Sequence, residues 1–383
     1  RRVLVRVDFN APIRDGEVVD DSRLRAALPT LQELLAGGAG LVLMSHLGRP
    51  KGPDPAWSME PVGRALAALI DRPVRVLDVV VGRRAEEAAA RLAPGDVLLL
   101  ENLRFDAGEK ADDPGFAAAL SRLADAYVND AFGTAHRAAA SVVGVTRLLP
   151  SFAGRLMARE LVMLTRVFAA PDRPFVVLLG GAKISDKIGV IDALLPRADA
   201  ILVGGGMANT FLAAAGMAAG DSLVETEALE VASRLAAAAG DKLRLPLDLV
   251  LGDALSADAA VQSAAVGDGV PPGWRALDIG PRTVADFESR LMGARTVVWN
   301  GPMGAFEVAP FAAGTLAMAR ALAGLVDATT IVGGGDSAAA VRSAGVADAL
   351  TWVSTGGGAS LELLEGKLLP AVKALAARCG APG

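Results

Sequence analysis

Short, largely apolar runs recur along the 383-residue chain and alternate with longer segments rich in Ala and Leu. Strands that are buried on both faces form such continuous apolar runs, whereas the longer segments between them are typical of helices. The alternation predicts an α/β fold with parallel sheets that helices cover on both faces. The predicted strands are Val3–Val7, Leu41–Met44, Val97–Leu100, Val176–Leu179, Ile201–Val203, Val297–Trp299, Ile331–Val332 and Trp352–Val353.

Polar or glycine-rich residues follow nearly every one of these runs. Residues 8–10 follow the first run, residues 45–49 the second and residues 101–104 the third. In open α/β sheets, ligands bind outside the carboxyl ends of the strands. These ends carry Asp, Asn, His and Arg in the first half of the chain, and glycine runs with Lys, Asn, Asp and Ser in the second half. We therefore expect two sheets that bind two different ligands.

The segment between the two halves, residues 152–168, is predicted to be a helix. Its apolar residues, among them Leu156, Leu164 and Phe168, lie near helical spacing. No disordered linker, charge block or short-period repeat separates the halves. We expect this helix to connect two domains.

Five basic residues of the first half follow predicted strands or lie in loops. Arginine side chains bind carboxylate and phosphate oxygens through two parallel hydrogen bonds, so several of them at one sheet edge would form an anion pocket. Each residue taken alone is equally typical of a solvated loop charge. The five are Arg23, His46, Arg49, Arg104 and Arg137.

The segment Gly180–Lys187 follows a predicted strand and is expected to open a helix. Its glycines permit close approach of a ligand to the backbone, and a helix N-terminus offers free N–H donors to phosphate. Lys183 and Lys187 are four residues apart, which would place both on one helix face, where they could hold phosphate oxygens. The alternative is an ordinary turn with two surface lysines.

Three further glycine loops, at residues 204–206, 333–335 and 356–358, each follow a predicted strand of the second half. Together they predict a cradle for a polyphosphate. Asp336 comes directly after the second loop and is placed to hold a Mg²⁺ ion bound to those phosphates.

Composition excludes several classes of partner. The net charge of −5 and the aromatic content of 4% argue against nucleic acid and against an anionic membrane surface. The single cysteine, Cys379, and a first segment without signal-peptide character favour a reducing, cytoplasmic location. Residues 200–220 have the length and polarity of a membrane span, but their glycines and the lack of flanking basic clusters favour a strand, a turn and a buried helix.

The chain lacks the sequence motifs of several enzyme classes. The chain contains no G-x-x-x-x-G-K-[ST] segment and no H-R-D with a following D-F-G, so it is neither a P-loop enzyme nor a protein kinase. Two histidines and one cysteine argue against a His/Cys zinc site. A nicotinamide-dependent dehydrogenase is the main alternative on this architecture, although residues 204–206 lack the third glycine of the dinucleotide fingerprint.

Eleven segments occur in the order found in phosphoglycerate kinases, and the chain resembles that family from end to end. They are VRVDFNAPI, DDSRLRAALPT, SHLGRPKG, ENLRF, YVNDAFGTAHRA, GGAKISDKI, GGGMANTF, LDIGP, WNGPMGAFE, GGGD and STGGGASLELLEGKLLP. The resemblance implies a monomer with two Rossmann-like domains with parallel sheets, joined by an interdomain helix and hinge. It places an N-terminal domain at residues 1–154, onto which residues 366–383 pack back, and a nucleotide-binding domain at residues 155–365 that begins with the helix 155–168.

The resemblance also implies a reaction of glycolysis and gluconeogenesis. ATP and the carboxylate of 3-phosphoglycerate would react reversibly to ADP and 1,3-bisphosphoglycerate, with Mg²⁺ bound to the nucleotide. The acceptor carboxylate is already ionised near pH 7, so the transfer needs no general base. It depends instead on in-line positioning and on stabilisation of charge.

Individual roles follow from the same resemblance. Around the transferring phosphoryl group it places Arg23, Lys183, Gly357 and Gly358. On 3-phosphoglycerate it places Asp8, Phe9, Asn10, Arg23, His46, Leu47, Gly48, Arg49, Arg104 and Arg137. On the nucleotide it places Ala182, Lys187, Gly205, Ala276, Leu277, Asn300, Pro302, Glu307, Gly334, Gly335, Asp336 and Ser337, with Asp336 as the metal ligand.

Two positions depart from the family pattern. Ala139 stands where a second histidine is common, which puts one basic contact in question. Ser337 stands where Thr is usual, and either hydroxyl can bond a phosphate. A homologue that binds ligands without catalysis is a further alternative; it would be expected to have lost Arg23, Lys183 or Asp336, and all three are present.

Overall fold

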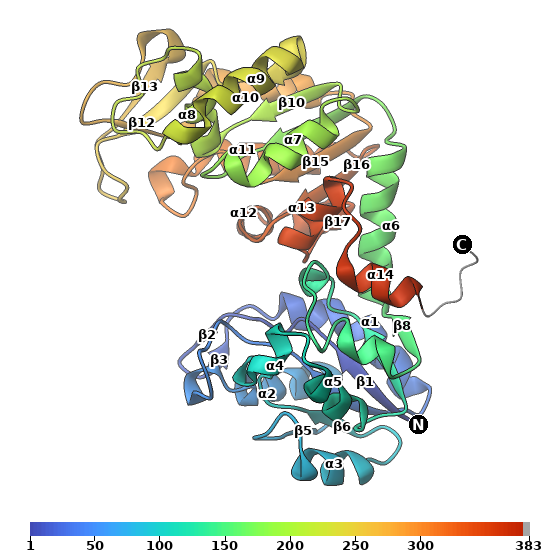
Figure 1. The fold of residues 1–383 in the computed structure, drawn as a ribbon. Helices are drawn as coiled ribbons and strands as arrows, with labels where there is room; N and C mark the ends of the chain where they lie inside the picture. Colours follow the sequence, from blue (N-terminus) through green and yellow to red (C-terminus); the bar gives the residue numbers. More distant parts are fainter. Residues whose placement is uncertain (378–383) are drawn as a thin grey trace. The chain divides into compact units, whose positions relative to one another are not determined.

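The computed structural model describes residues 1–377, so Cys379 and the end of the expected C-terminal segment lie outside the described residues. Internal contacts divide the chain into two compact units. Unit 1 comprises Arg1–Val162 and the segment that starts at Leu368, and unit 2 comprises Met163–Lys367. Each unit is built around its own parallel sheet (Figure 1). The domain boundaries expected at residues 154 and 365 stay predictions.

Unit 1 has a six-stranded sheet in the order β5-β6-β4-β1-β7-β8, and all of its neighbouring strands are parallel. The strands are β1 (Arg2–Arg6), β4 (Gly40–Met44), β5 (Val74–Val76), β6 (Val97–Leu99), β7 (Ala126–Asn129) and β8 (Ser151–Ala153), and a small hairpin adds β2 (Ile13–Arg14) and β3 (Glu17–Val18). The helices are α1 (Ser22–Ala36), α2 (Glu60–Ile70), α3 (Arg83–Ala90), α4 (Ala107–Lys110), α5 (Pro114–Ser121) and α14 (Pro370–Ala376).

Helices cover both faces of this sheet because successive strand residues point to opposite sides. On one face, Val5 packs with Leu24 of α1 and Leu66 of α2 in one apolar core. On the other face, Leu4 packs in a second core with Ala88 of α3, Leu120 of α5 and Leu375 of α14. The sheet therefore presents only its strand ends to ligands.

Unit 2 has a second six-stranded parallel sheet, in the order β11-β10-β9-β15-β16-β17. Its strands are β9 (Phe175–Leu179), β10 (Ala200–Val203), β11 (Leu243–Arg244), β15 (Thr296–Asn300), β16 (Thr329–Gly333) and β17 (Trp352–Val353). The helices are α6 (Arg155–Ala169), which begins in unit 1, α7 (Ile188–Leu194), α8 (Gly205–Ala214), α9 (Leu229–Ala239), α10 (Pro281–Leu291), α11 (Ala313–Ala323), α12 (Gly335–Ser343) and α13 (Gly358–Leu364).

A three-stranded antiparallel sheet in unit 2 was not predicted from the sequence. It consists of β12 (Asp248–Gly252), β13 (Val261–Ala265) and β14 (Arg275–Ile279) in the order β13-β12-β14. β13 is exposed along much of its length and carries no continuous apolar run, so the hydropathy pattern gave no sign of it. This sheet supplies one wall of a pocket described below.

The predicted parallel α/β architecture is confirmed. Each predicted strand overlaps an observed strand of one of the two large sheets, and α6 occupies the segment expected to join two domains. Residues 200–220 form β10 and then α8, as the strand-and-helix interpretation expected. Among the described residues, no helix has the length and apolarity needed to cross a membrane.

Candidate active site

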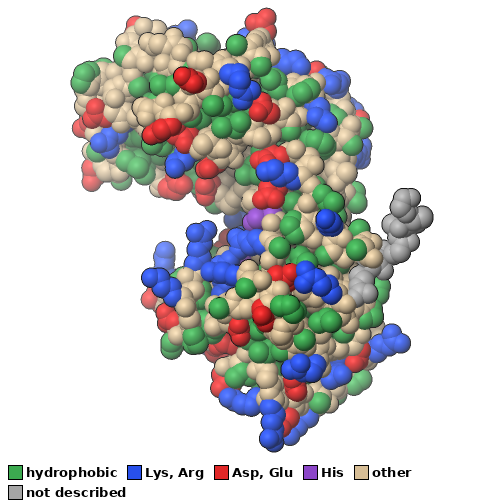
Figure 2. Space-filling view, in the orientation of Figure 1, with side chains coloured by type: hydrophobic (Ala, Val, Ile, Leu, Met, Phe, Trp, Pro, Cys, Tyr) green, Lys and Arg blue, Asp and Glu red, His purple; other side chains and the backbone are tan. Residues whose placement is uncertain are grey.

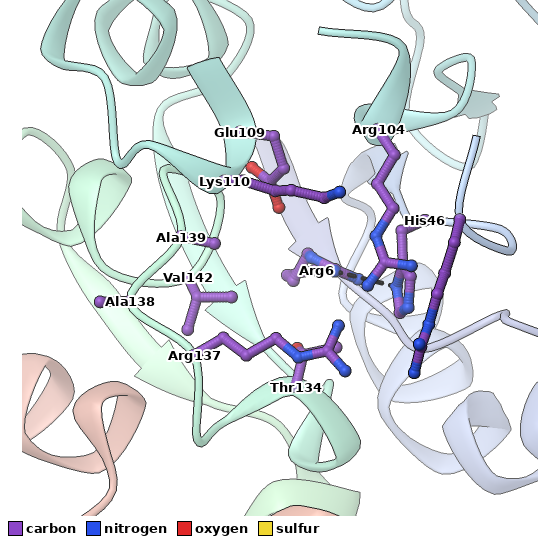
Figure 3. A pocket seen from close by; sticks show the side chains of 11 residues that line it. Arg6, His46, Arg104, Glu109, Lys110, Thr134, Arg137, Ala138, Ala139 and Val142 are labelled. Carbon is purple, nitrogen blue, oxygen red and sulfur yellow. Dashed lines mark hydrogen bonds between the residues drawn. The ribbon is translucent and has the colours of Figure 1, made fainter. Parts of the chain in front are cut away.

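The carboxyl edge of the sheet in unit 1 holds a cavity of about 480 Å³, here called the cationic cavity. Four of the five basic residues singled out in the sequence, all except Arg23, line it. Figure 3 shows Arg104, Arg137 and Lys110 directing their charged ends toward the space above Arg6 and His46. Lys and Arg side chains also gather beside a histidine on the surface of this unit (Figure 2). The lining residues are Arg6, His46, Arg49, Arg104, Glu109, Lys110, Thr134, Arg137, Ala138, Ala139 and Val142.

Arg23 lies next to this cavity and forms an ion pair with Asp8. Asp8 lies two residues after the end of β1, and its carboxylate lies 3.8 Å from Nδ1 of His46. Burial disfavours ionisation of Asp8, but the positive charges of Arg23 and Arg6 outweigh this effect and lower the pKa of its carboxyl group. Asp8 is therefore a buried anion at the edge of a positively charged site.

Two predicted substrate residues place their side chains in the apolar core. Phe9 and Leu47 are both buried and pack with the strands of the sheet. Their backbones hold the loops together, since the Phe9 N–H donates to Ser45 Oγ at 2.9 Å and the Leu47 N–H donates to Asn102 Oδ1 at 3.1 Å. Neither side chain is therefore available to a ligand.

The loop after β4 is held by the side chain of Asn102, which is fully buried. Its oxygen accepts from the backbone N–H groups of Leu47 and Arg104, and its amide donates to the carbonyl oxygens of Leu47 and Trp57 at 2.8 and 2.9 Å. Arg104 in turn donates to the Gly48 carbonyl. Asn102 therefore fixes Arg104 and the His46–Arg49 loop relative to each other.

Gly48 is required at its position in that loop for two reasons. Its φ of +59° is strained for a side-chain-bearing residue, and a Cβ atom would lie 1.9 Å from the Trp57 ring. Its N–H donates to Asn10 Oδ1 at 2.8 Å, which ties the loop to the segment that follows β1. The predicted substrate residues Asn10 and Gly48 are thereby brought together.

The charges of the cationic cavity are crowded. Burial, together with Arg137, Arg6 and Arg49, lowers the pKa of Arg104 to about 10. Burial also lowers the pKa of Arg137. Burial lowers the pKa of His46 well below its usual value, with Arg6, Arg104 and Arg137 adding to the effect, so the imidazole is neutral near pH 7. A bound anion would relieve this mutual repulsion.

Arg6 is a cavity residue that the sequence interpretation missed. Its side chain is 2% exposed and lies on the floor of the cavity (Figure 3). The sequence did indicate a role for Arg6, because burying an arginine in an otherwise apolar strand costs free energy unless its charge is paired or binds a ligand. Lys110 was also missed; it follows no predicted strand and reaches the cavity only because α4 folds over it.

Unit 2 holds a pocket of about 660 Å³, here called the glycine-rich pocket. Seven of the residues expected to bind the nucleotide line it, at positions 182, 205, 276, 277, 302, 307 and 336. The lining residues are Gly181, Ala182, Gly205, Gly206, Asn209, Asp221, Ser222, Leu223, Val224, Leu255, Arg275, Ala276, Leu277, Pro302, Gly304, Ala305, Glu307 and Asp336.

Close backbone packing forms one end of this pocket. The Gly180 N–H donates to the Asn300 carbonyl at 3.0 Å, and the Gly181 N–H donates to the Pro302 carbonyl at 2.8 Å. A Cβ atom on Gly180 would lie 2.0 Å from the Pro302 oxygen, and one on Gly301 would lie 2.2 Å from the Gly180 oxygen. Glycine is therefore needed here to let the ends of β9 and β15 meet.

Other expected nucleotide residues lie at the strand ends beside the pocket. Asn300 ends β15, and its buried Nδ2 has no hydrogen-bond partner among the described residues. Gly334 packs against this amide, and Gly335 is the first residue of α12. The hydroxyl of Ser337 accepts a hydrogen bond from the Gly301 N–H at 2.6 Å. An enclosed donor without a partner is suited to a ligand oxygen.

The expectation that Lys183 and Lys187 share one helix face is wrong. A single 3₁₀ turn, Ser185–Lys187, precedes α7, so the helix begins only at Ile188. Lys187 is buried, and burial lowers its pKa while Asp186 and Asp336 partly oppose this. Lys183 lies before the turn and is exposed. The two lysines thus occupy different environments and are suited to different contacts.

The expected catalytic residues are divided between the units. Arg23 belongs to α1 of unit 1, whereas Lys183, Gly357 and Gly358 belong to unit 2. Gly357 has a φ of +48°, and Gly358 is the first residue of α13. Neither unit by itself carries the complete expected set.

Three lining residues of the glycine-rich pocket, Leu223, Leu255 and Arg275, gave no sequence signal. Leu223 and Leu255 lie in connections, and Arg275 lies on the unpredicted strand β14. Leu223 and Leu255 are exposed apolar side chains, which suit the face of an aromatic base. Only the three-dimensional fold brings them to the pocket.

A family model described as phosphoglycerate kinase matches residues 1–367. The chain belongs to the phosphoglycerate kinase family. A protein named phosphoglycerate kinase from Chloroflexus aurantiacus is 56% identical over 384 residues, which covers 98% of this chain and 96% of that protein. One of the same name from Moorella thermoacetica is 56% identical over 379 residues, with the same coverage of 98% and 96%.

Solved phosphoglycerate kinases have a similar fold. The structure from Coxiella burnetii has a TM-score of 0.85 at 39% identity and covers 98% of this chain and 96% of that one. The structure from Pyrococcus horikoshii has a TM-score of 0.90 at 34% identity and covers 99% of this chain and 96% of that one. The chain is thus an enzyme of the kinase class that the family name describes, and the family implies ATP and 3-phosphoglycerate as substrates.

Proposed function

We propose that this chain transfers a phosphoryl group reversibly between ATP and the carboxylate of 3-phosphoglycerate. The observation that carries the proposal is the cationic cavity, in which several arginines surround a neutral histidine. A small substrate with a phosphate at one end and a carboxylate at the other matches this surplus of positive charge. The glycine-rich pocket matches a nucleotide polyphosphate. Its apolar side chains suit the base, and Asp336 suits a metal ion on the phosphates.

In unit 1, the residues bind and orient the acceptor. Arg49, Arg104 and Arg137 would hold its phosphate, with His46 donating a hydrogen bond. Asp8 and Asn10 would orient the glycerate part. Arg23 would stabilise the charge on the transferring phosphoryl group, since it lies beside the cavity and is a third exposed.

In unit 2, the residues bind the nucleotide. Lys187, Ser337 and the amide of Asn300 would bond phosphate oxygens, and Glu307 would bond the ribose. Lys183 and the backbone N–H groups of Gly357 and Gly358 would surround the transferring group, where fixed donors lower the barrier without reorganisation.

Asp336 fits a magnesium ion that is shared with the phosphates. Its side chain lines the glycine-rich pocket in the first turn of α12, and no described residue forms an ion pair or hydrogen bond with it. No cluster of three potential ligands from His, Cys, Asp and Glu occurs among the described residues, which suits Mg²⁺ bound by one carboxylate together with phosphate and water. When bound there, Mg²⁺ neutralises charge on the phosphate oxygens.

The transfer requires the acceptor and the nucleotide to meet, although unit 1 and unit 2 each carry one of the two sites. We propose that each unit acts as one domain, and that ligand-dependent closure about a hinge brings the sites together and excludes water. We further propose that the enzyme acts as a monomer in the cytoplasm. No partner chain is needed to complete either site, since each is lined by residues of this chain.

A coupled assay with MgATP and 3-phosphoglycerate tests the reaction. We expect turnover, and we expect Arg23→Ala to lower kcat by roughly a hundred- to a thousandfold with little change in nucleotide affinity. Arg25→Ala is the matched control, because Arg25 lies on the same helix and pairs only with Asp21 at the surface. Absence of turnover in folded protein contradicts the proposed reaction, and loss of nucleotide affinity in Arg23→Ala contradicts the role given to Arg23.

A further inference from the structure

We propose that Arg6, held in place by Ser141 and Glu109, fixes His46 as the neutral tautomer that carries its proton on Nε2. Arg6 would then be a positioning residue, and His46 would offer an N–H donor to an anion in the cationic cavity. The identity of that anion rests on the proposed function. The tautomer itself rests only on contacts within unit 1.

The contact between Arg6 and His46 has only one chemically possible direction. A guanidinium NH₂ group of Arg6 lies 3.3 Å from Nδ1 of His46 (Figure 3). Arginine stays protonated and has no acceptor atom, so Nδ1 must be the acceptor and cannot carry the proton. The proton of a neutral imidazole then resides on Nε2.

Asp8 agrees with this assignment. Its Oδ1 is enclosed and has no hydrogen-bond partner among the described residues, and it lies 3.8 Å from Nδ1 of His46. That separation is too long for a hydrogen bond. A proton on Nδ1 would face the guanidinium of Arg6, which brings two donors together.

A buried chain of hydrogen bonds prevents Arg6 from turning away. Its Nε donates to Ser141 Oγ at 2.9 Å, and another nitrogen donates to the Val7 carbonyl. Ser141 Oγ in turn donates to Glu109 Oε1 at 2.6 Å, and the Ser141 N–H donates to Glu109 Oε2 at 3.0 Å. Arg6, Ser141 and Glu109 are all at most 4% exposed, so water competes little for these bonds.

Burial is the main reason that the ring of His46 stays neutral. Besides burial, the groups that act on His46 are Asp8, which favours the charged form, and Arg6, Arg104 and Arg137, which oppose it. Burial and the three arginines together outweigh Asp8, so the pKa of His46 lies well below its usual value. No described residue bonds to Nε2, and His46 lines the cavity, so the N–H is available to a ligand oxygen.

His136 is the only other histidine of the chain and provides an internal contrast. There, Arg137 donates its Nε–H to Nε2 of the ring at 3.2 Å. By the same reasoning, neutral His136 carries its proton on Nδ1. The two histidines are thus expected to be opposite tautomers.

Two-bond ¹H–¹⁵N correlation spectra of protein labelled at histidine test the proposal without any substrate. At about pH 8, above the ordinary histidine pKa of about 6.5, we expect one ring with the Nε2–H pattern and one with the Nδ1–H pattern. His46→Gln assigns the first pattern to His46 by its disappearance. An Nδ1–H pattern for His46, or a doubly protonated ring at this pH, overturns the proposal.

Two variants test the part played by Arg6. In Arg6→Met, we expect His46 to lose its single tautomer and to show an averaged pattern; an unchanged Nε2–H pattern in folded protein overturns the role of Arg6. Ser141→Ala covers the case in which Arg6→Met does not fold, and it should weaken the preference of His46 while Ser121→Ala, a buried serine of α5 that bonds only Ala117, leaves it unchanged. Equal His46 spectra for the two serine variants overturn the supporting role of Ser141.

Discussion

Lys187 is the buried cation beside the glycine-rich pocket. Hydrogen bonds to charged groups contribute roughly 1.5–3 kcal/mol, so we expect Lys187→Met to weaken ADP binding by roughly ten- to a hundredfold. The change keeps the length of the side chain and removes a desolvated charge, so we expect the stability of unit 2 to be retained or raised. Titration calorimetry with ADP measures the effect.

Lys242→Met is the matched control for that experiment. Lys242 belongs to the same unit, and its Nζ donates to the Leu195 carbonyl at 3.2 Å, away from the pocket. We expect its ADP affinity to equal that of the wild type. An unchanged affinity in Lys187→Met removes Lys187 from the nucleotide site.

Asp278 is a buried carboxyl group in which burial raises the pKa to about 7. The unfolded value is about 3.9, so between about pH 4 and pH 7 the folded state keeps a proton that the unfolded state releases. The free energy of unfolding contributed by this group therefore falls as the pH rises through this window. The Gly314 and Ile279 N–H groups that it binds partly oppose the shift.

We expect Asp278→Asn to lack this pH dependence. The free energy of unfolding of the variant minus that of the wild type should rise across the window by up to about 1.4 kcal/mol per pH unit. Urea unfolding at several pH values measures it, with the exposed Asp268→Asn as control. A difference that does not vary with pH contradicts the raised pKa of Asp278.

At the scale of elements, the meeting of β9 and β15 shapes the glycine-rich pocket. In Gly180→Ala, the added methyl would lie 2.0 Å from the backbone oxygen of Pro302, so the two strand ends must separate. We expect a stability loss of roughly 1–3 kcal/mol together with weaker ADP binding. Thermal unfolding and ADP titration measure the two effects.

Gly267→Ala is the control for Gly180→Ala. Gly267 also lies in unit 2, but an added Cβ there has no atom within 4 Å and no positive φ to strain it. We expect little change in stability or affinity. Equal behaviour of the two variants would mean that the strand ends are free to separate without cost.

The central strands of the large sheets could be predicted because they are buried on both faces and therefore form apolar runs, whereas the short, partly exposed strands β5, β8 and β11 were not predicted. The strand ends could be predicted too, since Asp8 and Asn300 directly follow such runs and His46 lies two residues after one. The exposed antiparallel strand β13 was not predicted because it has no apolar run. The 3₁₀ turn before α7 was not predicted either, because the four-residue spacing of Lys183 and Lys187 does not distinguish a helix from a turn that precedes one.

The residues that complete each site were harder to predict than the strand ends. Arg6 was missed because it lies within the apolar run Val3–Val7, although a charge in a buried strand could have indicated a functional residue. Leu223 and Leu255 reach the glycine-rich pocket from connections far apart in the chain. Their placement depends on packing between elements, which no local pattern records.

At the scale of the whole molecule, the proposed closure predicts a change in size. We expect the radius of gyration measured by small-angle X-ray scattering to fall when MgADP and 3-phosphoglycerate are both present, because both ligands are needed to bridge the two sites. Each ligand alone should have a smaller effect. An unchanged radius with both ligands bound contradicts closure.

The two units differ in how they are encoded, and this has a consequence for synthesis on the ribosome. Unit 2 is one uninterrupted segment, Met163–Lys367, whereas unit 1 needs residues from both ends of the chain. The Ala371 N–H at the start of α14 donates to the Ala135 carbonyl of unit 1 at 3.1 Å. During translation, all of unit 2 has therefore been made before α14 is available, and the half of the enzyme that is synthesised first is the last to be completed.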